Sequence, residues 1–539
     1  MAIDLRQTAI DPDIKEIPPT RNTQADLRAV LKDLQGNILK SHGRDHSRHL
    51  FITFRTTSKG ERDKARKWLA GLAVTSAFTQ REEARAYRET LAVIGENGAF
   101  TPAEQRRLIL DSSKVFVGVL ISAAGYRDLG LGTDAMPDDP AFRAGAKERT
   151  ALLNDPKTDQ WEPGFRNTLH ALVIAADDDA KKRLDPLIEK MRGQLKDLAL
   201  HLHEETGAAM RLDAAGEPDN DAPVREHFGF VDGISQPLFF AEDIDRARAR
   251  QGGIDRYDPS APLDQVLLKD PGGDRSTGYG SYFVYRKLEQ DVAGFRAGEK
   301  GLAKELAEHD GHKKPVPDPV VAGYTPLAGA YMVGRFQDGT PVLERNEAGL
   351  GAQPNNFTFD GDADGVRCPF QAHIRKTNPR GDKQRQFGVP LTQERSNRIV
   401  RRGISYGKVT LDPKPEDGKV GLLFLCAQSS IADQFEFIQA AWANYQDFLT
   451  PGSGLDPVIG TLPRTTPPPA PVAQPWPKKY GSHNQLDFTK PQAQPPHFPT
   501  PMSHTFPKAV GQWVTMRGGE YFFIPSLSAL KAFGKVAEK

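Results

Sequence analysis

The stretch TLHALVIAADDDAKKRLDPLIEKMRGQLKDLALHLHEETGAAMRL, residues 168–212, holds the patterns that decide the fold of the first half of the chain. Residues 168–177 are mostly apolar and predict a buried strand. Residues 178–198 place apolar side chains three and four positions apart, which predicts an amphipathic helix. Residues 199–212 predict a second strand, so the stretch is a strand, a helix and a strand.

The residues before this stretch supply the elements that complete the unit. Residues 49–55 predict a strand, and the Arg- and Glu-rich residues 59–91 predict a helix. Residues 113–126 predict a strand that runs into a small-residue turn and the start of a helix. The order is strand, helix, strand, strand, helix, strand, which predicts a ferredoxin-like α+β unit.

A second set of elements follows in the other half of the chain. Strands are predicted at residues 280–288, 420–428 and 518–526, and helices at residues 291–309 and 431–449. The two halves share no obvious sequence identity, yet the order of elements is similar. We therefore expect a second ferredoxin-like unit.

Changes in composition indicate where the domains end. Residues 1–26 are polar and rich in proline, which predicts an N-terminal arm. A polar stretch before residue 221 predicts a boundary between a first domain, residues 27–220, and a second domain, residues 221–539. Residues 451–507 contain fifteen prolines, too many for a helix or a central strand. We expect this segment to wrap around the second domain, and a disordered linker is the alternative.

Bulk composition excludes some classes of function. The 539 residues include 71 basic and 70 acidic ones, and a net charge of +1 gives no reason to expect nucleic acid or a membrane as a partner. Cys368 and Cys426 cannot form a disulfide framework, and the N-terminal residues show no signal-peptide pattern. The longest apolar runs are shorter than the roughly 20 residues that span a bilayer. We expect a cytoplasmic protein, and its oligomeric state is open.

Three short clusters contain residues that could carry chemistry. They are GFVDG at residues 229–233, CPFQAHIRKTNPR at 368–380 and RRGISYG at 401–407. Each has an ordinary structural interpretation: a turn-forming acid, a packed histidine, and an arginine pair that faces solvent or a carboxylate. Together, however, histidine, aspartate and arginine are the three kinds of group that a haem peroxidase requires. A histidine binds the iron, a base moves the protons of peroxide, and a cation stabilises the charge that develops as the O–O bond breaks.

The clusters also carry a family resemblance. EHFGFVDGISQP, residues 226–237, resembles the segment of dye-decolourising peroxidases that contains their GxxDG signature. CPFQAHIRKTNPR resembles the segment with the proximal histidine of that family, and RRGISYG the segment with its distal arginine. The likeness runs from about Asp33 to the C-terminus. Further matching segments are residues 33–39, 331–342, 433–444 and 518–523.

The resemblance implies a fold and a set of principal site residues. It implies two ferredoxin-like domains in a barrel-like arrangement, with haem b held mainly by the C-terminal one. Asp232 matches the distal acid, His373 the axial ligand of the haem iron, and Arg401 the distal arginine, with Arg402 as the alternative. Burial should raise the pKa of Asp232 and Arg401 should lower it, and we expect Asp232 to be ionised enough to act as a base.

The sequence suggests several further site residues, on less specific evidence. Gly233 and Ile234 flank the distal acid and are expected to contact the cofactor. Arg375 and His227 could approach the haem propionates. Glu436 could accept a hydrogen bond from the free nitrogen of His373, and an ordinary surface acid is the alternative.

Two further pairs of residues have both a functional and a structural interpretation. Trp442 and Tyr445 lie on one face of the helix predicted at residues 431–449, so they either pack in the core or relay electrons. His201 and His203 alternate on a strand and point to one face, a spacing found in metal sites. Because no acid or cysteine nearby completes a ligand set in the sequence, we expect a structural role for this pair.

The resemblance implies a haem-dependent peroxidase. It would reduce hydrogen peroxide and oxidise bulky aromatic donors, such as phenols and anthraquinone-like dyes, in one-electron steps. The first alternative is a haem-binding protein for haem handling or sensing with little turnover. The second is a haem-free α+β protein that serves as an assembly or cargo module, in which the three motifs are purely structural.

Overall fold

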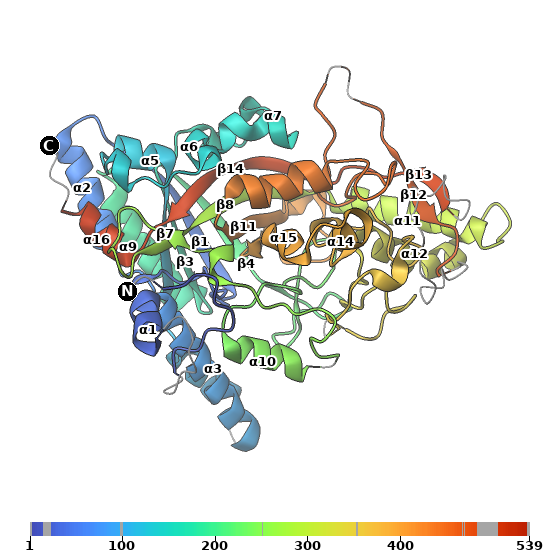
Figure 1. Cartoon of the computed structure of the whole chain (residues 1–539), viewed down its shortest axis with the longest axis horizontal. Helices are drawn as coiled ribbons and strands as arrows, with labels where there is room; N and C mark the ends of the chain where they lie inside the picture. Colours follow the sequence, from blue (N-terminus) through green and yellow to red (C-terminus); the bar gives the residue numbers. More distant parts are fainter. Residues whose placement is uncertain are drawn as a thin grey trace.

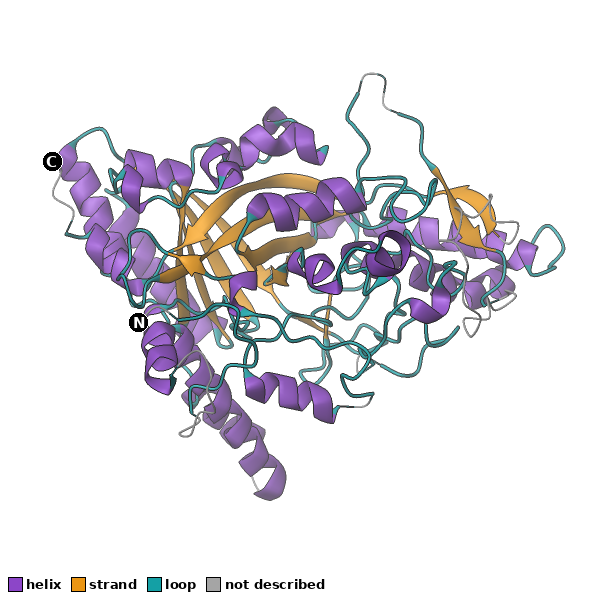
Figure 2. Cartoon of the chain, viewed as in Figure 1, coloured by secondary structure: helices purple, strands orange, loops and turns teal. Residues whose placement is uncertain are grey.

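A ten-stranded antiparallel sheet runs through the protein, shown as one curved layer of strands with helices outside it (Figure 2). Along the sheet the order is β10-β11-β8-β14-β2-β3-β1-β4. The computed structural model describes residues 3–13, 23–97, 101–250, 252–351, 354–465, 467, 469–481 and 505–535.

Each half of the chain contributes four neighbouring strands to this sheet (Figure 1). In both halves the fourth, first, third and second strands of the half lie next to one another in that order, which confirms two ferredoxin-like units. The first half supplies β1 (His46–Phe54), β2 (Phe116–Ser122), β3 (Ala171–Asp177) and β4 (Ala199–Ala208). The second half supplies β8 (Tyr279–Gln290), β10 (Ile404–Tyr406), β11 (Gly421–Gln428) and β14 (Val514–Ile524).

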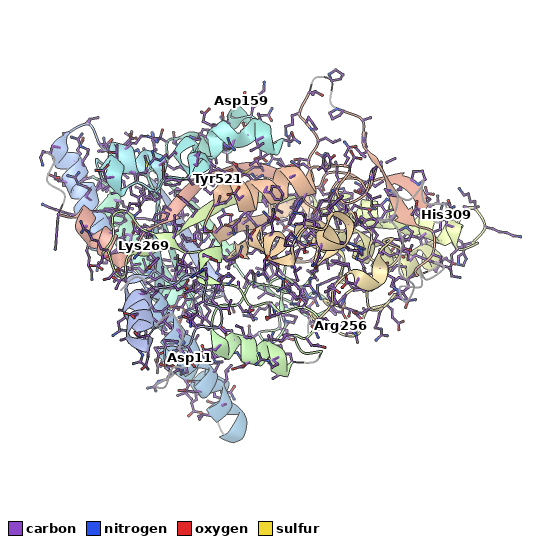
Figure 3. The ribbon with its side chains drawn as sticks, viewed as in Figure 1. Asp11, Asp159, Arg256, Lys269, His309 and Tyr521 are labelled. Atoms are coloured by element: carbon purple, nitrogen blue, oxygen red, sulfur yellow. The ribbon has the colours of Figure 1, made fainter. Side chains whose placement is uncertain are left out.

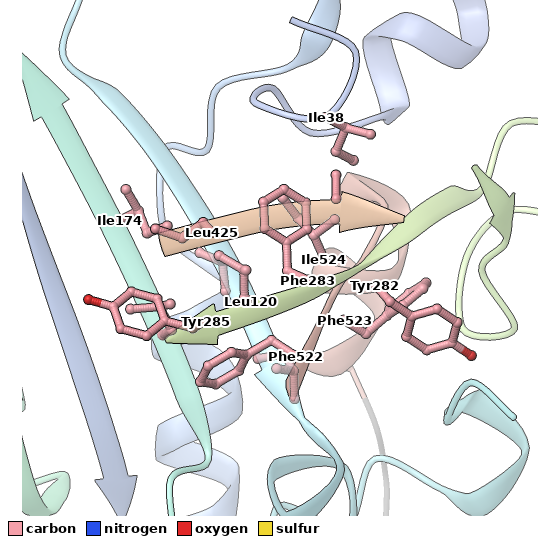
Figure 4. Close-up of a cluster of buried hydrophobic side chains, with 14 of the residues drawn as sticks. Ile38, Leu120, Ile174, Tyr282, Phe283, Tyr285, Leu425, Phe522, Phe523 and Ile524 are labelled. Carbon is pink, nitrogen blue, oxygen red and sulfur yellow. The ribbon is translucent and has the colours of Figure 1, made fainter. Parts of the chain in front are cut away.

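The two units are joined into one sheet by their last and second strands. In β14, Phe522 pairs with Ser122 of β2, and Phe523 pairs with Ile121. Figure 4 shows the cluster at this junction, where phenylalanines of β8 and β14 pack against aliphatic side chains from the first half. Phe522 and Phe523 are 0% exposed, so separating the halves would expose large apolar surfaces to water.

The sheet curves until its two edge strands meet. Gly207 of β4 lies against Ile404 of β10, and a Cβ atom at Gly207 would come within 2.4 Å of the Cγ2 atom of Ile404. The barrel-like arrangement therefore depends on a residue without a side chain at the closing edge. Such a close approach of backbone to side chain is a common reason for glycine inside a strand.

The helices agree with the prediction except where the chain bends within a predicted segment. The helix predicted at residues 59–91 is two helices, α2 (Lys59–Ala70) and α3 (Ala77–Asn97), because Gly71 ends the first. The segment 178–198 forms a π-type turn, η4 (Ala180–Leu184), and α9 (Asp185–Leu195). The helix expected at 431–449 consists of η8 (Ile431–Glu436) and η9 (Ile438–Ala443), both of π type.

Helices outside these predictions also cover the second unit. In addition to α11 (Val292–His309), the chain forms α12 (Asp318–Val333) and the short α13 (His373–Thr377). The other α-helices are α1 (Gln24–Asp33), α4 (Pro102–Asp111), α5 (Ala123–Asp128), α6 (Pro140–Ala144), α7 (Thr150–Leu153), α8 (Pro163–Arg166), α10 (Ala241–Ala249), α14 (Asp382–Phe387), α15 (Leu391–Ser396) and α16 (Leu527–Phe533). The short strands are β5 (Met210–Arg211), β6 (Val224–Arg225), β7 (Leu268–Lys269), β9 (Val400–Arg401), β12 (Ala473–Pro477) and β13 (Thr505–Ala509).

The predicted arm and the proline-rich segment are described only in part. Residues 3–13 pack on the body of the protein, where the Ile10 amide donates to the Phe239 carbonyl at 2.8 Å. In the proline-rich segment β12 pairs with β13, and residues 482–504 lie outside the described residues. The proposed wrap and the domain boundary near residue 220 therefore stay predictions. In the described parts of the chain, no helix has the length and apolar character needed to cross a bilayer.

We expect Gly207→Val to destabilise the protein, because the new side chain would collide with Ile404 of the opposite edge strand. Overpacking of this kind costs about 1–3 kcal/mol, which lowers the midpoint of urea unfolding. Gly193→Ala in α9 is the matched control, since a Cβ there meets nothing within 4 Å. It should raise stability by roughly 0.5–1 kcal/mol through helix propensity. An unchanged midpoint for Gly207→Val would contradict the close approach of β4 and β10.

Candidate active site

A cavity of about 270 Å³ lies between the sheet of the second unit and the loops and helices that cover it. This volume lies just below the range of roughly 300–1,000 Å³ for small-molecule sites. Strands β8, β11 and β14 supply one wall through side chains such as Leu288, Phe424 and Met516. Asp155 and Pro156 come from the first unit, so both units contribute to the wall.

The GFVDG loop folds back on β6 and brings Asp232 to the cavity. The Asp232 amide donates to the Val224 carbonyl at 2.9 Å, which ties the end of the loop to β6. Gly229 and Gly233 have φ angles of +91° and +80°, a region that residues with side chains rarely adopt. The glycine spacing of the motif therefore has a backbone cause. Phe228, Phe230 and Ile234 line the cavity beside Asp232.

Asp232 and Arg401 form an ion pair inside the cavity. The Nη1 atom of Arg401 donates to Oδ1 of Asp232 at 2.8 Å, and the Gly233 amide donates to the same oxygen at 2.6 Å. Burial alone would raise the pKa of Asp232, but the Arg401 charge and the Gly233 hydrogen bond outweigh it and hold the pKa below its usual value. Asp232 is therefore ionised at neutral pH.

The structure distinguishes Arg401 from its neighbour Arg402. Arg401 ends β9 and lines the cavity, where its Nη2 atom also donates to the Ile234 carbonyl at 3.1 Å. Arg402 points to the other side and donates to the carbonyls of Asn37 and Ile38. Successive side chains of a strand point to opposite faces, so only one of the two arginines can reach the cavity.

His373 reaches the cavity from the first position of α13. Its Nδ1 atom lies 2.8 Å from Oδ2 of Asp456, whose side chain is fully buried. Burial opposes ionisation of Asp456, but His373 and the amides of Val458 and Ile459 together lower its pKa. An ionised Asp456 makes Nδ1 the protonated nitrogen, which leaves Nε2 with a lone pair for a metal.

The prediction that Glu436 accepts this hydrogen bond is wrong. Both oxygens of Glu436 are engaged by Arg149, at 2.8 and 2.7 Å, and Tyr521 donates to one of them at 3.0 Å. Figure 3 labels Tyr521, which lies in β14 of the sheet. Sequence reasoning missed Asp456, although GLDPVIG has the same signal as GFVDG, a lone acid in an apolar stretch.

Neither Arg375 nor His227, which were expected to approach the haem propionates, is among the residues that line the cavity. Arg375 is 0% exposed and forms ion pairs with Asp362 and Asp382 at 2.9 and 2.7 Å, which anchor α13 from behind. His227 is also buried, and its Nε2 atom contacts the Tyr406 carbonyl at 2.9 Å.

The aromatic and histidine pairs lie outside the cavity wall. Trp442 is buried against Phe437 and Phe448, whereas Tyr445 is 51% exposed. The expectation that no nearby acid completes a ligand set is wrong for His203, which forms a cluster with Glu162 and Glu205.

The ammonium group of Lys287 already lies within that cluster. Its Nζ atom donates to Glu162 at 2.7 Å and to Glu205 at 2.8 Å. The lysine ammonium group therefore balances the charge of these acids, and no metal ion is needed for this. The structural role expected for the histidine pair therefore agrees with these contacts.

Three buried arginines give the cavity a cationic wall. Arg335, Arg380 and Arg398 line the cavity, and in the described parts of the chain no carboxylate forms an ion pair with any of them. Their hydrogen bonds go to neutral acceptors, such as the carbonyls of Gly339 and Phe357. Burial lowers the pKa of Arg335 to about 9 and that of Arg380 to about 10. Buried cations of this kind call for an anionic ligand.

These features fit haem b, the cofactor expected from the resemblance. The apolar walls suit a flat macrocycle, Nε2 of His373 suits its iron, and the unpaired arginines suit its two propionates. Gly233 and Ile234 adjoin Asp232, and Ile234 lines the same cavity. The residues present therefore match the chemistry of the cofactor at three independent points.

Comparison with known proteins gives consistent relatives. No protein-family model matches the chain. The chain is 36% identical over 527 residues to the multifunctional dye peroxidase DyP2 of Amycolatopsis sp. The aligned residues cover 95% of this chain and 97% of that protein. It is 30% identical over 448 residues to the dye-decolorizing peroxidase msp1 of Mycetinis scorodonius, covering 77% of this chain and 75% of that protein.

Solved structures give a similar result. The structure of a DyP-type peroxidase of Anabaena sp. (AnaPX) superposes with a TM-score of 0.79 at 37% identity, over 98% of this chain and 99% of that one. The structure of DyP2 from Amycolatopsis sp. superposes with a TM-score of 0.74 at 34% identity, over 98% of this chain and 100% of that one.

We expect Glu226 to make stability depend on pH. Burial raises its pKa to about 7, although the amides of Phe228 and Phe230 and the side chain of Gln290 donate to it. The folded state therefore holds this proton more tightly than the unfolded state. The free energy of unfolding falls as the pH rises from the ordinary glutamate pKa of 4.5 to about 7. Urea unfolding at pH 5 and pH 8 should show Glu226→Gln gaining stability relative to wild type at the higher pH.

The exposed acid Glu148 supplies the control, because Glu148→Gln should follow the wild-type curve at both pH values. If the free energies of unfolding of Glu226→Gln and wild type differ by the same amount at pH 5 and pH 8, the raised pKa of Glu226 is contradicted.

Proposed function

This chain belongs to the dye-decolorizing peroxidase family, and from that premise we propose that Asp232, Arg401 and His373 carry out its reaction with peroxide. The protein is a haem-dependent peroxidase that acts on dyes. The observation that carries the residue assignment is the 2.8 Å ion pair of Asp232 and Arg401, which lines the same cavity as His373.

Asp232 is proposed to move the protons of hydrogen peroxide. When bound, haem b supplies an iron at which peroxide is reduced and to which donors return electrons one at a time. Because Asp232 is ionised, it would accept a proton from one oxygen of hydrogen peroxide and deliver it to the other oxygen as the O–O bond breaks. Water is then the product that leaves.

Arg401 is proposed to stabilise the charge that develops as the O–O bond breaks. Its guanidinium is fixed by two contacts, to Asp232 and to the Ile234 carbonyl, so it need not reorganise during the reaction. A preorganised cation in a site that excludes water acts far more strongly than one in solvent. The same ion pair keeps Asp232 ready to accept a proton.

His373 is proposed to bind the iron through Nε2, with Asp456 behind it. A carboxylate that accepts a hydrogen bond from Nδ1–H gives the imidazole partial anionic character and makes it a stronger electron donor. Arg335, Arg380 and Arg398 are proposed to hold the propionates. A haem-binding protein without turnover would have no use for the ion pair of Asp232 and Arg401, so that alternative is not favoured.

The donors are proposed to be bulky aromatic molecules such as phenols and anthraquinone-like dyes, oxidised in one-electron steps. Trp442 and the exposed Tyr445 remain the proposed electron relays, since Trp442 lies in the π-type helix η9, which packs against α13, and Tyr445 follows that helix. A cytoplasmic location is also a proposal, supported by the two buried cysteines, Cys368 and Cys426, which are both unpaired.

The peroxide reaction can be tested by changing the proposed base. Asp232→Asn keeps the shape of the side chain but cannot accept a proton, so we expect the reaction with peroxide to slow by about 10²–10⁴-fold. Stopped-flow absorption after one equivalent of peroxide gives this rate, and an unchanged resting spectrum shows that haem is retained. A variant as fast as wild type would remove Asp232 from the mechanism.

The iron ligand and its partner can be tested by a matched pair of acids. We expect Asp456→Asn to weaken haem binding or activity by about 10–100-fold and to raise the reduction potential of the iron, because a negative charge behind His373 is lost. Glu436→Gln is the control and should leave the potential unchanged, since Glu436 pairs with Arg149 instead. Spectroelectrochemical titration measures both. Equal effects of the two substitutions would contradict the assignment of Asp456.

A further inference from the structure

Lys376 lies one turn after His373 in α13, and it is 0% exposed. Its Nζ atom donates to the Tyr445 carbonyl at 2.7 Å and to the Gly454 carbonyl at 2.6 Å. Among the described residues, no carboxylate forms an ion pair with this lysine, whereas its neighbour Arg375 pairs with two aspartates. A buried ammonium group without a carboxylate partner is costly to the fold, so its presence here calls for an explanation beyond packing.

The carbonyls that bind Lys376 belong to the part of the chain that leads to Asp456. This part follows η9, and we call residues 445–456 the 445–456 loop. Gly454 is two residues before Asp456, whose Oδ2 atom lies 2.8 Å from Nδ1 of His373. The ammonium group and the imidazole, which lie three positions apart on α13, therefore both contact this loop.

The end of the loop is also held by hydrogen bonds that do not involve Lys376. The Asp456 amide donates to the Ala443 carbonyl at 3.0 Å. The Asp456 carboxylate accepts from the amides of Val458 and Ile459 at 2.8 and 3.0 Å. Each of these donors is a neutral amide, so they place the carboxylate but do not balance its charge. What Lys376 adds at this position is a positive charge.

The charge of Lys376 interacts mainly with Asp456. Burial lowers the pKa of Lys376 to about 7, although the negative charges of Asp456 and, to a smaller extent, Asp447 oppose this change. Both acids belong to the 445–456 loop, η9 carries no ionisable side chain, and Arg375 of α13 is bound to its own aspartates. Below about pH 7 the ammonium group is therefore ionised, close to the Asp456 carboxylate.

Two charges of opposite sign then act on the imidazole of His373. The Asp456 carboxylate makes the imidazole a stronger electron donor, which lowers the reduction potential of the iron that it would bind. The ammonium charge of Lys376 weakens this effect, because its field at the imidazole opposes that of the carboxylate. Such interactions are strong between buried groups, where little water is present to screen them.

We propose that Lys376 sets the reduction potential of the iron through Asp456 and His373, with its ammonium charge limiting the electron donation that Asp456 promotes. The inference rests on the roles proposed above for His373 and Asp456. It assigns opposite effects to two neighbouring charges: the carboxylate lowers the potential, and the ammonium group raises it. Because an iron of higher potential is a stronger oxidant, the lysine favours the oxidation of donors.

Spectroelectrochemical titration of the haem-loaded protein at pH 6 measures this effect, since Lys376 is ionised there in wild type. Lys376→Met removes the charge and keeps an unbranched side chain, so we expect a lower reduction potential. At a fixed applied potential the ratio of reduced to oxidised haem should fall by about tenfold, which for a one-electron couple is a shift of about 59 mV. Asp456→Asn should shift the potential in the opposite direction.

Two further variants separate charge from structure. Lys190→Met removes an exposed lysine of α9 in the first unit and should leave the potential unchanged. Lys376→Gln keeps a donor for the loop carbonyls without the charge, so it should also lower the potential, and it provides the measurement if methionine is not tolerated. At pH 9, where the wild-type amine is neutral, the difference between wild type and either Lys376 variant should disappear.

The outcomes distinguish this inference from the proposed function. A lower potential of the Lys376 variants at pH 6 that vanishes at pH 9 supports it. An unchanged or higher potential at pH 6, the same difference at both pH values, or loss of haem from both variants would overturn it. If Asp456→Asn also leaves the potential unchanged, the roles proposed for His373 and Asp456 fail. If Asp456→Asn raises the potential, those roles stand and only that of Lys376 is lost.

Discussion

The pairing of β14 with β2 is the contact on which the rest of the architecture depends. The last strand of the second unit adds to the open edge of the first, and the phenylalanines of that strand are buried in the cluster common to both. Because this contact buries apolar surface from distant parts of the chain, neither unit has the same core without the other. The junction also fixes the position of Asp155, which comes from the first unit and lines the cavity of the second.

Around that cavity, the partners of each charged side chain explain which groups are ionised and which could bind an anionic ligand. Asp232 is balanced by Arg401, and the Asp456 carboxylate is balanced by His373 and two amides, so each acid is ionised although Asp456 is fully buried and the Asp232 side chain is only 27% exposed. The arginine wall has no such balance within the described residues. Buried charges without partners are costly, which is the physical reason to assign them to the carboxylates of a cofactor.

Local sequence patterns predicted the fold more accurately than they predicted the contacts of the site. Alternating strands and helices predicted both ferredoxin-like units, and the glycines of GFVDG marked a turn that needs positive φ angles. Element boundaries were less accurate where a single glycine, Gly71, or a π-type turn interrupts a regular helix. The partner of His373 was wrong, because Asp456 is 83 residues away and follows no periodic pattern. Arg375 was predicted to approach the cofactor because of its charge, but it forms ion pairs with Asp362 and Asp382, whose side chains are 0% exposed.

By itself, the sequence determined the order of the elements and the family, and it singled out Asp232, His373 and the pair of Arg401 and Arg402 as candidates, because these depend on spacing and residue type within short segments. Only the tertiary structure decided that Arg401 and not Arg402 reaches the cavity, that Asp456 lies behind His373, and that the strands of both units form one curved sheet. The physical reason is that hydrogen bonds and burial are set by distances in space. Residues far apart in the chain meet only once the sheet has closed, and local periodicity holds no information about which of them will meet.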